Sequence, residues 1–550
     1  MKNKRRQPRP GDAAAQSKPR AKKSLWFFAA ALTAALWAYS PALKGPFLFD
    51  DNMLPFTSAD RATAPLLAWM RGGRPALMFT YWINARISGD DTFSYHALNL
   101  LIHCAAAVFL LHPIQTEAVA YLAGRSECLS VMLALAAFAV FLYRGKTETS
   151  WGASLAVLTL FGAALLAKEH TIALPALLIL TDYWWNPGFA LRGVWRNWRL
   201  YGPMAVGGAA GLAMFWGPIF HSRTAGFGLK DFTWYQYFFT QCRALFVYPA
   251  EFLLPVRLTA DWDFPISKNI LDHGAIAGLI ALVGLAAAAW HFRRRFPLAS
   301  YGFFAYLLLM APTSSILPIQ DPVAERRIYF SMIGLLLILL EPLSRLKANP
   351  RALAAVFAAV ALVAAGATYA RAAVWGDPML LWQDTARKSP NKARGHENLA
   401  FQYYLQGNYD LAIPEFETAA RLEPATQGLL VNWALAYDNL KQPERAIEKL
   451  REAARLPAPV YNSPAHVYTQ IAMVYAQQAQ WALALDALAT AEKLDPRSPE
   501  IYLYRGKVYL ATDRPAEAIP QYQRVLAIDA TYDEARRDLA QAQARLAAKH

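Results

Sequence analysis

Long apolar runs separated by short polar loops fill the first 370 or so residues of the chain. Each run holds roughly 16 to 20 mostly apolar residues, close to the ~20 that a helix needs to cross the hydrocarbon of a bilayer. Helices are the only open segments that cross lipid with every backbone group satisfied. The pattern therefore predicts an all-α, polytopic membrane domain. The runs lie at 25–43, 95–111, 128–143, 152–167, 171–185, 200–219, 274–291, 298–312, 328–344 and 352–370.

Two apolar segments need a separate interpretation. Segment 235–256 is aromatic and apolar but contains Arg243 and Glu251, which favours an interfacial or re-entrant helix. The run at 25–43 could be a cleaved signal peptide, but no clear small-x-small site follows it and the tail before it is long. We therefore expect a retained anchor.

After the last apolar run the pattern changes to a repeat. Ala412, Ala446, Ala484 and Ala518 recur at steps of 34, 38 and 34 residues. A helix-turn-helix period of 34 residues is the tetratricopeptide signature. Such units stack into an α-solenoid with a concave binding surface. The expected domains are a basic disordered cytoplasmic tail (1–23), a membrane domain (24–372), a linker (373–390) and about four repeats (391–550).

Charge sets the expected orientation. The net charge of +15 could suggest nucleic-acid binding, but much of it lies in residues 2–23 and in short loops between apolar runs. That is the positive-inside pattern, so we expect no nucleic-acid partner. The basic loops at 144–146, 192–199, 293–295 and 345–351 are placed in the cytoplasm with the N-terminus. The loops at 44–94, 112–126, 168–170, 220–273 and 313–327 are then outside, as are the repeats.

One run conflicts with this topology. The loops at 44–94 and 112–126 should share a side, yet a single apolar run, 95–111, lies between them. Either this run does not cross fully, or a returning helix is absent from the chain.

Candidate chemistry begins directly after the first run, at Asp50 and Asp51. Adjacent carboxylates at a membrane surface are costly in a partly dry site unless they are used. A carboxylate there can take a proton from an attacking hydroxyl. The alternative is a helix cap beside a solvated loop acid. Three cysteines in or beside apolar runs give no disulfide framework.

The other outer loops carry a second set of ionisable residues. His112 and Glu117 could ligate a metal, but no second histidine stands at helical spacing, so no metal is assigned; a capping turn is the alternative. Lys168, Glu169 and His170 separate two apolar runs, which indicates a functional site or a short wet turn.

A pair of arginines completes the set of candidate residues in the outer loops. Arg326 and Arg327 suit a phosphate, because the guanidinium fork matches its oxygens; otherwise they pair with Asp321 and Glu325. Together these acids and cations suit one reaction: a hydroxyl attacks a sugar carbon, a carboxylate removes the proton, and cations stabilise the departing phosphate. A single displacement of this kind inverts the anomeric centre.

At these residues the chain resembles the transmembrane-and-tetratricopeptide O-mannosyltransferases of the GT-C glycosyltransferase class, as a bacterial-type member. The resemblance rests on ordered stretches along nearly the whole chain. They are Phe49-Asp50-Asp51, Tyr95–Asn99, His112–Glu117 with Gly124-Arg125, Ala167-Lys168-Glu169, Ala324–Arg326 with Tyr329, Trp382, Pro390-Asn391 and Asn398–Ala400.

The resemblance implies a GT-C fold and a polyprenyl-phosphate-linked sugar, such as mannose, as donor, with no further cofactor. Asp50 or Asp51 would be the base. The donor and its phosphate would be bound by residues drawn from His112, Glu117, Arg125, Lys168, Glu169, Glu325, Arg326 and Arg327. The lipid tail of the donor would lie in the bilayer, and the repeats would hold acceptor polypeptides outside a bacterial cytoplasmic membrane. The family usually has two spans between the His96 region and His112, where this chain has room for one.

Two other functions stay open. The chain could be a membrane-anchored scaffold whose repeats assemble other proteins, although a scaffold needs neither ten apolar runs nor clustered ionisable residues. It could also transfer sugar to a glycolipid, which makes less use of a solenoid.

Overall fold

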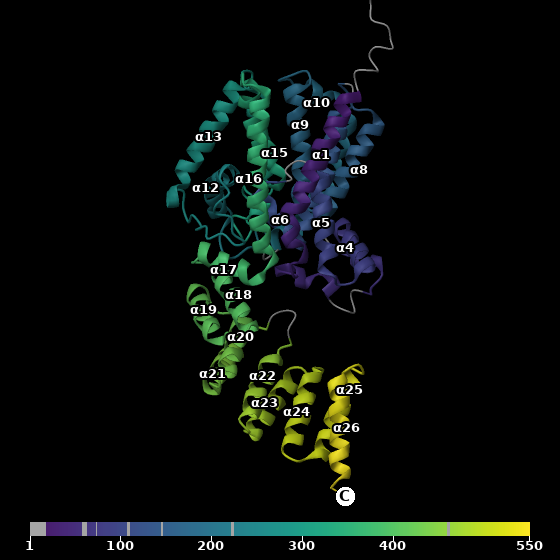
Figure 1. Cartoon of the computed structure of the whole chain (residues 1–550), viewed down its shortest axis with the longest axis vertical. Helices are drawn as coiled ribbons and strands as arrows, with labels where there is room; N and C mark the ends of the chain where they lie inside the picture. The colour runs from purple at the N-terminus through teal and green to yellow at the C-terminus, as the bar shows by residue number, and fades with distance from the viewer. Residues whose placement is uncertain are drawn as a thin grey trace, which may run out of the picture. The chain divides into compact units, whose positions relative to one another are not determined.

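A computed structural model describes residues 18–57, 63–72, 74–106, 111–144, 147–221, 225–458 and 463–549, so most of the expected basic tail lies outside the described residues. The chain forms two compact units, Met1–Asp384 and Thr385–His550. The described residues form helices joined by turns and loops (Figure 1). A single bridge, Ala225 with Ile319, is the only β-pairing among them. The predicted all-α class is confirmed. The boundaries proposed at 372 and 391 stay predictions.

The ten apolar runs all fall on helices of the first unit. Four of these helices, Leu122–Leu142 (with its leading turn), Asp272–Phe292, Glu325–Arg345 and Pro350–Gly376, have the length and composition of membrane spans among the described residues. The α-helices of this unit are α1 Lys18–Tyr39, α3 Leu66–Trp69, α4 Pro75–Ser88, α5 Thr92–Ala106, α6 Thr116–Ala120, α7 Arg125–Leu142, α8 Trp151–Ala167, α9 Leu174–Trp185, α10 Arg192–Arg196, α11 Trp198–His221, α12 Trp234–Leu253, α13 Ala275–Phe292, α14 Pro297–Met310, α15 Ile328–Arg345, α16 Pro350–Gly376 and α17 Pro378–Lys388, the last of which continues into the second unit.

Short 3₁₀ helices shape the loops of this unit. They are η1 Ser40–Lys44, η2 Phe49–Met53, η3 Pro55–Thr57, η4 Pro113–Gln115, η5 Leu122–Gly124, η6 Glu169–Ala173, η7 Asp272–Gly274 and η8 Glu325–Arg327. Four of them, η2, η4, η6 and η8, begin at or beside the ionisable residues chosen from the sequence. Those side chains are therefore held at tight turns next to long helices.

Glycines allow one helix pair to pack closely. A Cβ atom built on Gly302 of α14 would lie 2.5 Å from the backbone oxygen of Gly334 on α15, and the reverse contact is equally short. Any side chain at either position would push the helices apart, since no real Cβ makes so short a contact. The α14–α15 pair thereby fixes the position of α15, which directly follows Arg326 and the 3₁₀ helix η8.

The basic loops gather at one end of the first unit, and α10 marks that end in Figure 1. Contacts at this end include an Arg144–Asp182 ion pair at 2.7 Å and a hydrogen bond of 3.1 Å from Trp184 to the backbone of Pro297. A hydrogen bond from Arg345 to the backbone of Arg295 joins two of the basic loops. The loops expected outside lie at the other end, with α4 and α6 (Figure 1). Helix α7 connects the ends over 18 residues, about 27 Å at the α-helical rise.

The run at 95–111 is described only as far as Ala106. Helix α5 covers this described part, with 15 residues from Thr92 to Ala106, about 22 Å, and residues 107–110 lie outside the described part. Asn99, halfway along α5, still contacts the backbone of Val119 and Tyr121 in the 112–126 loop. His96 on α5 contacts Gly45 at 3.1 Å. Both loops therefore lie at the same end of the unit, which favours the alternative in which this run does not cross fully.

Segment 235–256 forms α12, a 20-residue helix whose Glu251 is buried and pairs with Arg257 at 3.0 Å. Its position relative to a membrane stays a prediction.

The second unit is a series of helical hairpins. They are α18 Ala393–Leu405 with α19 Tyr409–Leu422, α20 Gln427–Asn439 with α21 Pro443–Ala453, α22 His466–Gln477 with α23 Trp481–Leu494, and α24 Pro499–Ala511 with α25 Pro515–Ile528, followed by α26 Asp533–Ala547. The four phased alanines, Ala412, Ala446, Ala484 and Ala518, are fully buried in the second helix of each hairpin. Only a methyl group fits where paired helices approach closely, which explains the repeat in the sequence.

Candidate functional site

The two adjacent aspartates occupy different surroundings in η2. The buried carboxylate of Asp51 accepts hydrogen bonds from the backbone of Leu48 at 3.0 Å and of Ala123 at 2.8 Å, one on each oxygen. Burial raises the pKa of Asp51 to about 7, and the two backbone bonds oppose that rise. Asp51 thus caps its own turn and joins the first outer loop to the second.

Asp50 is exposed, and its backbone N–H donates to the hydroxyl of Tyr121 at 3.1 Å. The preceding residue, Phe49, has a left-handed φ of 49°, which is strained for an aromatic residue. The rings of Tyr121 and Trp382 hold Phe49, with centroid distances of 5.4 and 4.9 Å. Strain that neighbouring side chains enforce is common where a functional group must point in a set direction.

Arg326 and Glu117 form the first of three ion pairs in this part of the first unit. The Glu117 carboxylate is buried and accepts from the Arg326 guanidinium and, at 2.8 Å, from the Arg326 backbone. The Arg326 side chain keeps 30% of its surface exposed, so it can still meet a ligand.

Lys168 and Arg74 contribute the other two pairs. Lys168 contacts the buried carboxylate of Glu127, which His170 also approaches at 3.3 Å. Arg74 binds Glu169 through two parallel hydrogen bonds of 2.9 Å each. Burial opposes ionisation of Glu169, but the Arg74 guanidinium outweighs it and lowers the pKa of that carboxyl.

These pairs belong to one cluster. Arg326 interacts electrostatically with Glu127 and Lys168, and Arg74 interacts with the same two residues. Arg326 also acts on Tyr121, which holds the backbone of Asp50. We define the acid–cation cluster as Asp50, Arg74, Glu117, Tyr121, Glu127, Lys168, Glu169 and Arg326. The structure therefore links Glu117, Lys168 and Arg326 through ion pairs and neighbouring charges, and Asp50 is joined to them through Tyr121.

Four other candidates have their polar groups engaged elsewhere. His112 contacts the backbone of Phe252 at 2.9 Å. Arg125 is fully buried and donates to Asn84 and Asn99 at 2.9 and 2.6 Å. Both residues join structural elements, so their assignment to the donor site stays a prediction that the geometry does not favour.

Glu325 and Arg327 also hold the loop before α15 in place. Glu325 accepts from the backbone of Thr259 at 2.5 Å, and Arg327 donates to the backbone of Pro322 at 2.8 Å. The alternative named for the paired arginines was pairing with Asp321 and Glu325. Arg326 forms its ion pair with the distant Glu117, and Arg327 donates to the backbone of Asp321.

No three His, Cys, Asp or Glu side chains gather in a way that would hold a metal ion within the described ranges. His112 and Glu117, the pair considered for a metal, face different partners.

Arg74, Tyr121 and Glu127 are the members of the cluster that the sequence interpretation did not select. Glu127 could have been found, because it is a lone acid in the first turn of an apolar helix. Arg74 and Tyr121 carry no local signal. They reach the cluster only through contacts with Glu169 and Asp50, which are 95 and 71 residues away in sequence.

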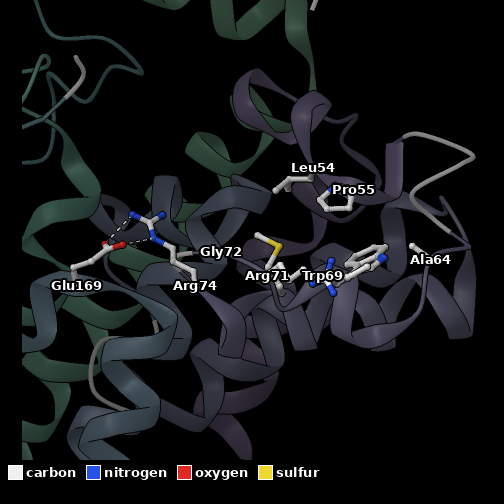
Figure 2. A pocket seen from close by; sticks show the side chains of 10 residues that line it. Leu54, Pro55, Ala64, Trp69, Arg71, Gly72, Arg74 and Glu169 are labelled. Carbon is white, nitrogen blue, oxygen red and sulfur yellow. Dashed lines mark hydrogen bonds and ion pairs between the residues drawn. The ribbon is translucent and has the colours of Figure 1, made fainter. Parts of the chain in front are cut away.

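A pocket of about 570 Å³ adjoins the cluster, and the Arg74–Glu169 ion pair forms one end of its lining (Figure 2). The rest of its lining comes from the first outer loop and the start of α4. The other lining residues are Leu54, Pro55, Ala64, Ala68, Trp69, Arg71, Gly72 and Met78.

Curated relatives support the resemblance stated from the motifs. The chain is 23% identical over 498 residues to the human protein O-mannosyl-transferase TMTC1, covering 72% of this chain and 55% of that protein. It is 23% identical over 527 residues to human TMTC3, also named a protein O-mannosyl-transferase, covering 83% and 57%. The chain thus spans a little over half the length of these relatives. The resemblance to the transmembrane-and-tetratricopeptide O-mannosyltransferases is confirmed.

The C-terminal repeats match a known repeat family. Residues 402–459 and 469–533 match the family model of the tetratricopeptide repeat. Among solved structures, a thermophilic tetratricopeptide protein of Thermus thermophilus is 24% identical, with 34% of this chain and 94% of that chain covered and a TM-score of 0.26.

Proposed function

We propose that this chain, which is similar to protein O-mannosyl-transferases over most of its length, transfers a sugar from a polyprenyl-phosphate carrier to Ser or Thr hydroxyls of exported polypeptides. Mannose is the proposed sugar, and the reaction is an inverting displacement. The observation that carries the proposal is the gathering of Asp50, Lys168 and Arg326 from three outer loops into one cluster at one end of a helical membrane body.

In the proposed step, the acceptor hydroxyl oxygen bonds to the anomeric carbon while the bond from that carbon to the phosphate oxygen breaks. The electron pair of the broken bond leaves with the polyprenyl phosphate. Asp50 takes the hydroxyl proton, because its carboxylate is exposed, whereas both oxygens of Asp51 are occupied. Arg326 and Lys168 stabilise the charge that develops on the phosphate.

The ion pairs support this role for the cations. Each of Arg74, Lys168 and Arg326 has a carboxylate partner within the protein. The partners keep the cations in place, and a phosphate can add to the exposed part of Arg326 without disturbing the buried Glu117.

The direct test uses membranes that contain the chain and radiolabelled polyprenyl-phosphate mannose. We expect label to appear on protein, and to be absent in matched membranes that lack the chain. Failure to label any protein despite normal expression would contradict the proposal. Label recovered only in lipid would favour the glycolipid acceptor.

A scaffold is the second candidate, because the repeats form hydrophobic cores of their own. Deletion of residues 391–550 separates the two. If the chain is an enzyme whose repeats hold the acceptor, the deletion abolishes protein labelling but spares hydrolysis of the lipid donor. A scaffold shows neither protein labelling nor donor hydrolysis, with or without the repeats.

A further inference from the structure

We propose that the pocket beside the Arg74–Glu169 ion pair binds the residues that flank the acceptor hydroxyl, and that it selects an apolar side chain with an acidic neighbour. The role of a hydroxyl as the acceptor rests on the proposed function. The preference for an apolar and acidic peptide rests on the pocket itself (Figure 2).

The lining of the pocket favours an apolar group over a sugar. Six of its ten lining residues are apolar: Leu54, Pro55, Ala64, Ala68, Trp69 and Met78. A sugar ring bears hydroxyls on most of its carbons, and each loses bonds to water against such a wall without replacement. An aliphatic side chain instead gains by leaving water. The volume of about 570 Å³ lies within the range of small-ligand sites.

The charges on the lining add the acidic preference. Arg74 is already matched by Glu169 through both of its parallel hydrogen bonds. Arg71 is exposed, and no carboxylate pairs with it anywhere in the described part of the chain. The lining therefore presents one uncompensated positive charge to a ligand. A guanidinium in this state binds a carboxylate in preference to a cation.

The position of the pocket suits an acceptor that arrives from water. Its walls come from η3, α3 and the start of α4, and none of these elements is a candidate span. Leu54 and Pro55 follow Asp50 by only four and five residues. A peptide with one side chain in the pocket can thus bring a neighbouring hydroxyl toward Asp50, since extended residues advance about 3.3–3.6 Å each.

Binding of short peptides to the full chain in detergent micelles tests the inference without any donor. Three fluorescent peptides share a central serine and differ in the two residues that flank it. The first has leucine and aspartate, the second has leucine and lysine, and the third has serine and aspartate. Fluorescence polarisation measures each dissociation constant. We expect the leucine–aspartate peptide to bind at least tenfold more tightly than the other two.

Single substitutions test whether residues of the pocket cause this peptide preference. Arg71→Glu should reverse the order of the aspartate and lysine peptides, and Ala68→Trp, which fills the pocket, should weaken the leucine peptides at least tenfold. Lys44→Glu is the matched control, because Lys44 is exposed on the same outer loop but does not line the pocket; it should leave all three constants unchanged. An unchanged order in Arg71→Glu would overturn the inference, whether or not Ala68→Trp folds.

The two proposals fail separately. Selective binding without sugar transfer in the labelling experiment would contradict the proposed function and leave the pocket as a peptide site. Sugar transfer with no preference among the three peptides would contradict the pocket and leave the proposed function.

Discussion

At the scale of single residues, Asp50 and Asp51 are adjacent in sequence, yet their carboxylates have opposite surroundings. Asp51 is buried and accepts one backbone N–H on each oxygen, while Asp50 is exposed beside Tyr121. Two neighbouring acids are indistinguishable in a sequence, because their difference lies in contacts with Ala123 and Tyr121 in another loop. Arg74 was missed for the same reason, since its partner Glu169 lies 95 residues away.

Substitution by asparagine separates the two aspartates. Asp50→Asn should reduce sugar transfer about 100-fold to 10,000-fold, the usual effect of losing a general base, and leave thermal unfolding unchanged. Asp51→Asn should destabilise the protein by about 1–3 kcal/mol, because its NH₂ group would face a backbone N–H. Transfer assays and thermal unfolding in the same detergent measure both. Normal transfer by Asp50→Asn would remove the base assignment.

Stability should also depend on pH through Asp51. Its pKa is raised to about 7 in the folded protein, against about 3.9 in an unfolded chain. Between these values the folded state holds a proton that the unfolded state has lost, so Asp51 makes the protein less stable as the pH rises from about 4 to 7. The melting temperature of the wild type should therefore fall more steeply over this window than that of Asp51→Asn. Parallel curves would contradict the raised pKa.

At the scale of elements, the apolar runs predicted the helices of the membrane unit well, because hydrophobic length is a local property of the sequence. Run 95–111 needed the structure as well. Its composition suits a span, but the polar residues His96 and Asn99 in its described part bind loops at one end of the unit. Composition reports whether a helix tolerates lipid, whereas contacts show which loops lie at the same end.

Helix packing gives a prediction at this scale. Gly334→Leu should separate α15 from α14 and lower stability by about 1–3 kcal/mol or more, as overpacking does, because its Cβ would meet the Gly302 backbone oxygen at 2.5 Å. Gly284→Leu on α13 is the matched control, since nothing lies within 4 Å of that position. Thermal unfolding in detergent compares the two. Equal melting temperatures would show that the α14–α15 contact is not close.

At the scale of the whole molecule, the contacts of α5 bear on the topology, because His96 and Asn99 bind two loops at the same end of the unit. We therefore predict that α5 does not cross and that nine helices do: α1, α7, α8, α9, α11, α13, α14, α15 and α16. An odd number of crossings puts the two ends of the chain on opposite sides. We predict that the basic loops at one end of the unit lie on the cytoplasmic side.

Reporter fusions test this arrangement. A reporter of extracytoplasmic location fused at the C-terminus should be active, and the same reporter fused at Arg144 should be inactive. A cytoplasmic signal at the C-terminus would contradict the nine crossings. Activity at both positions would contradict the placement of the basic loops.

The sequence by itself determined the properties that depend on local pattern: a helical membrane body, a tetratricopeptide array with buried alanines at a fixed phase, and ionisable residues in the outer loops. Only the tertiary structure decided which of those residues meet. It brought Asp50, Lys168 and Arg326 together with Arg74 and Glu127, and it turned Asp51, Arg125 and Arg327 to structural contacts. The physical reason is that hydrophobic length acts within one helix, whereas an ion pair forms between side chains that only the packing of several helices brings within reach.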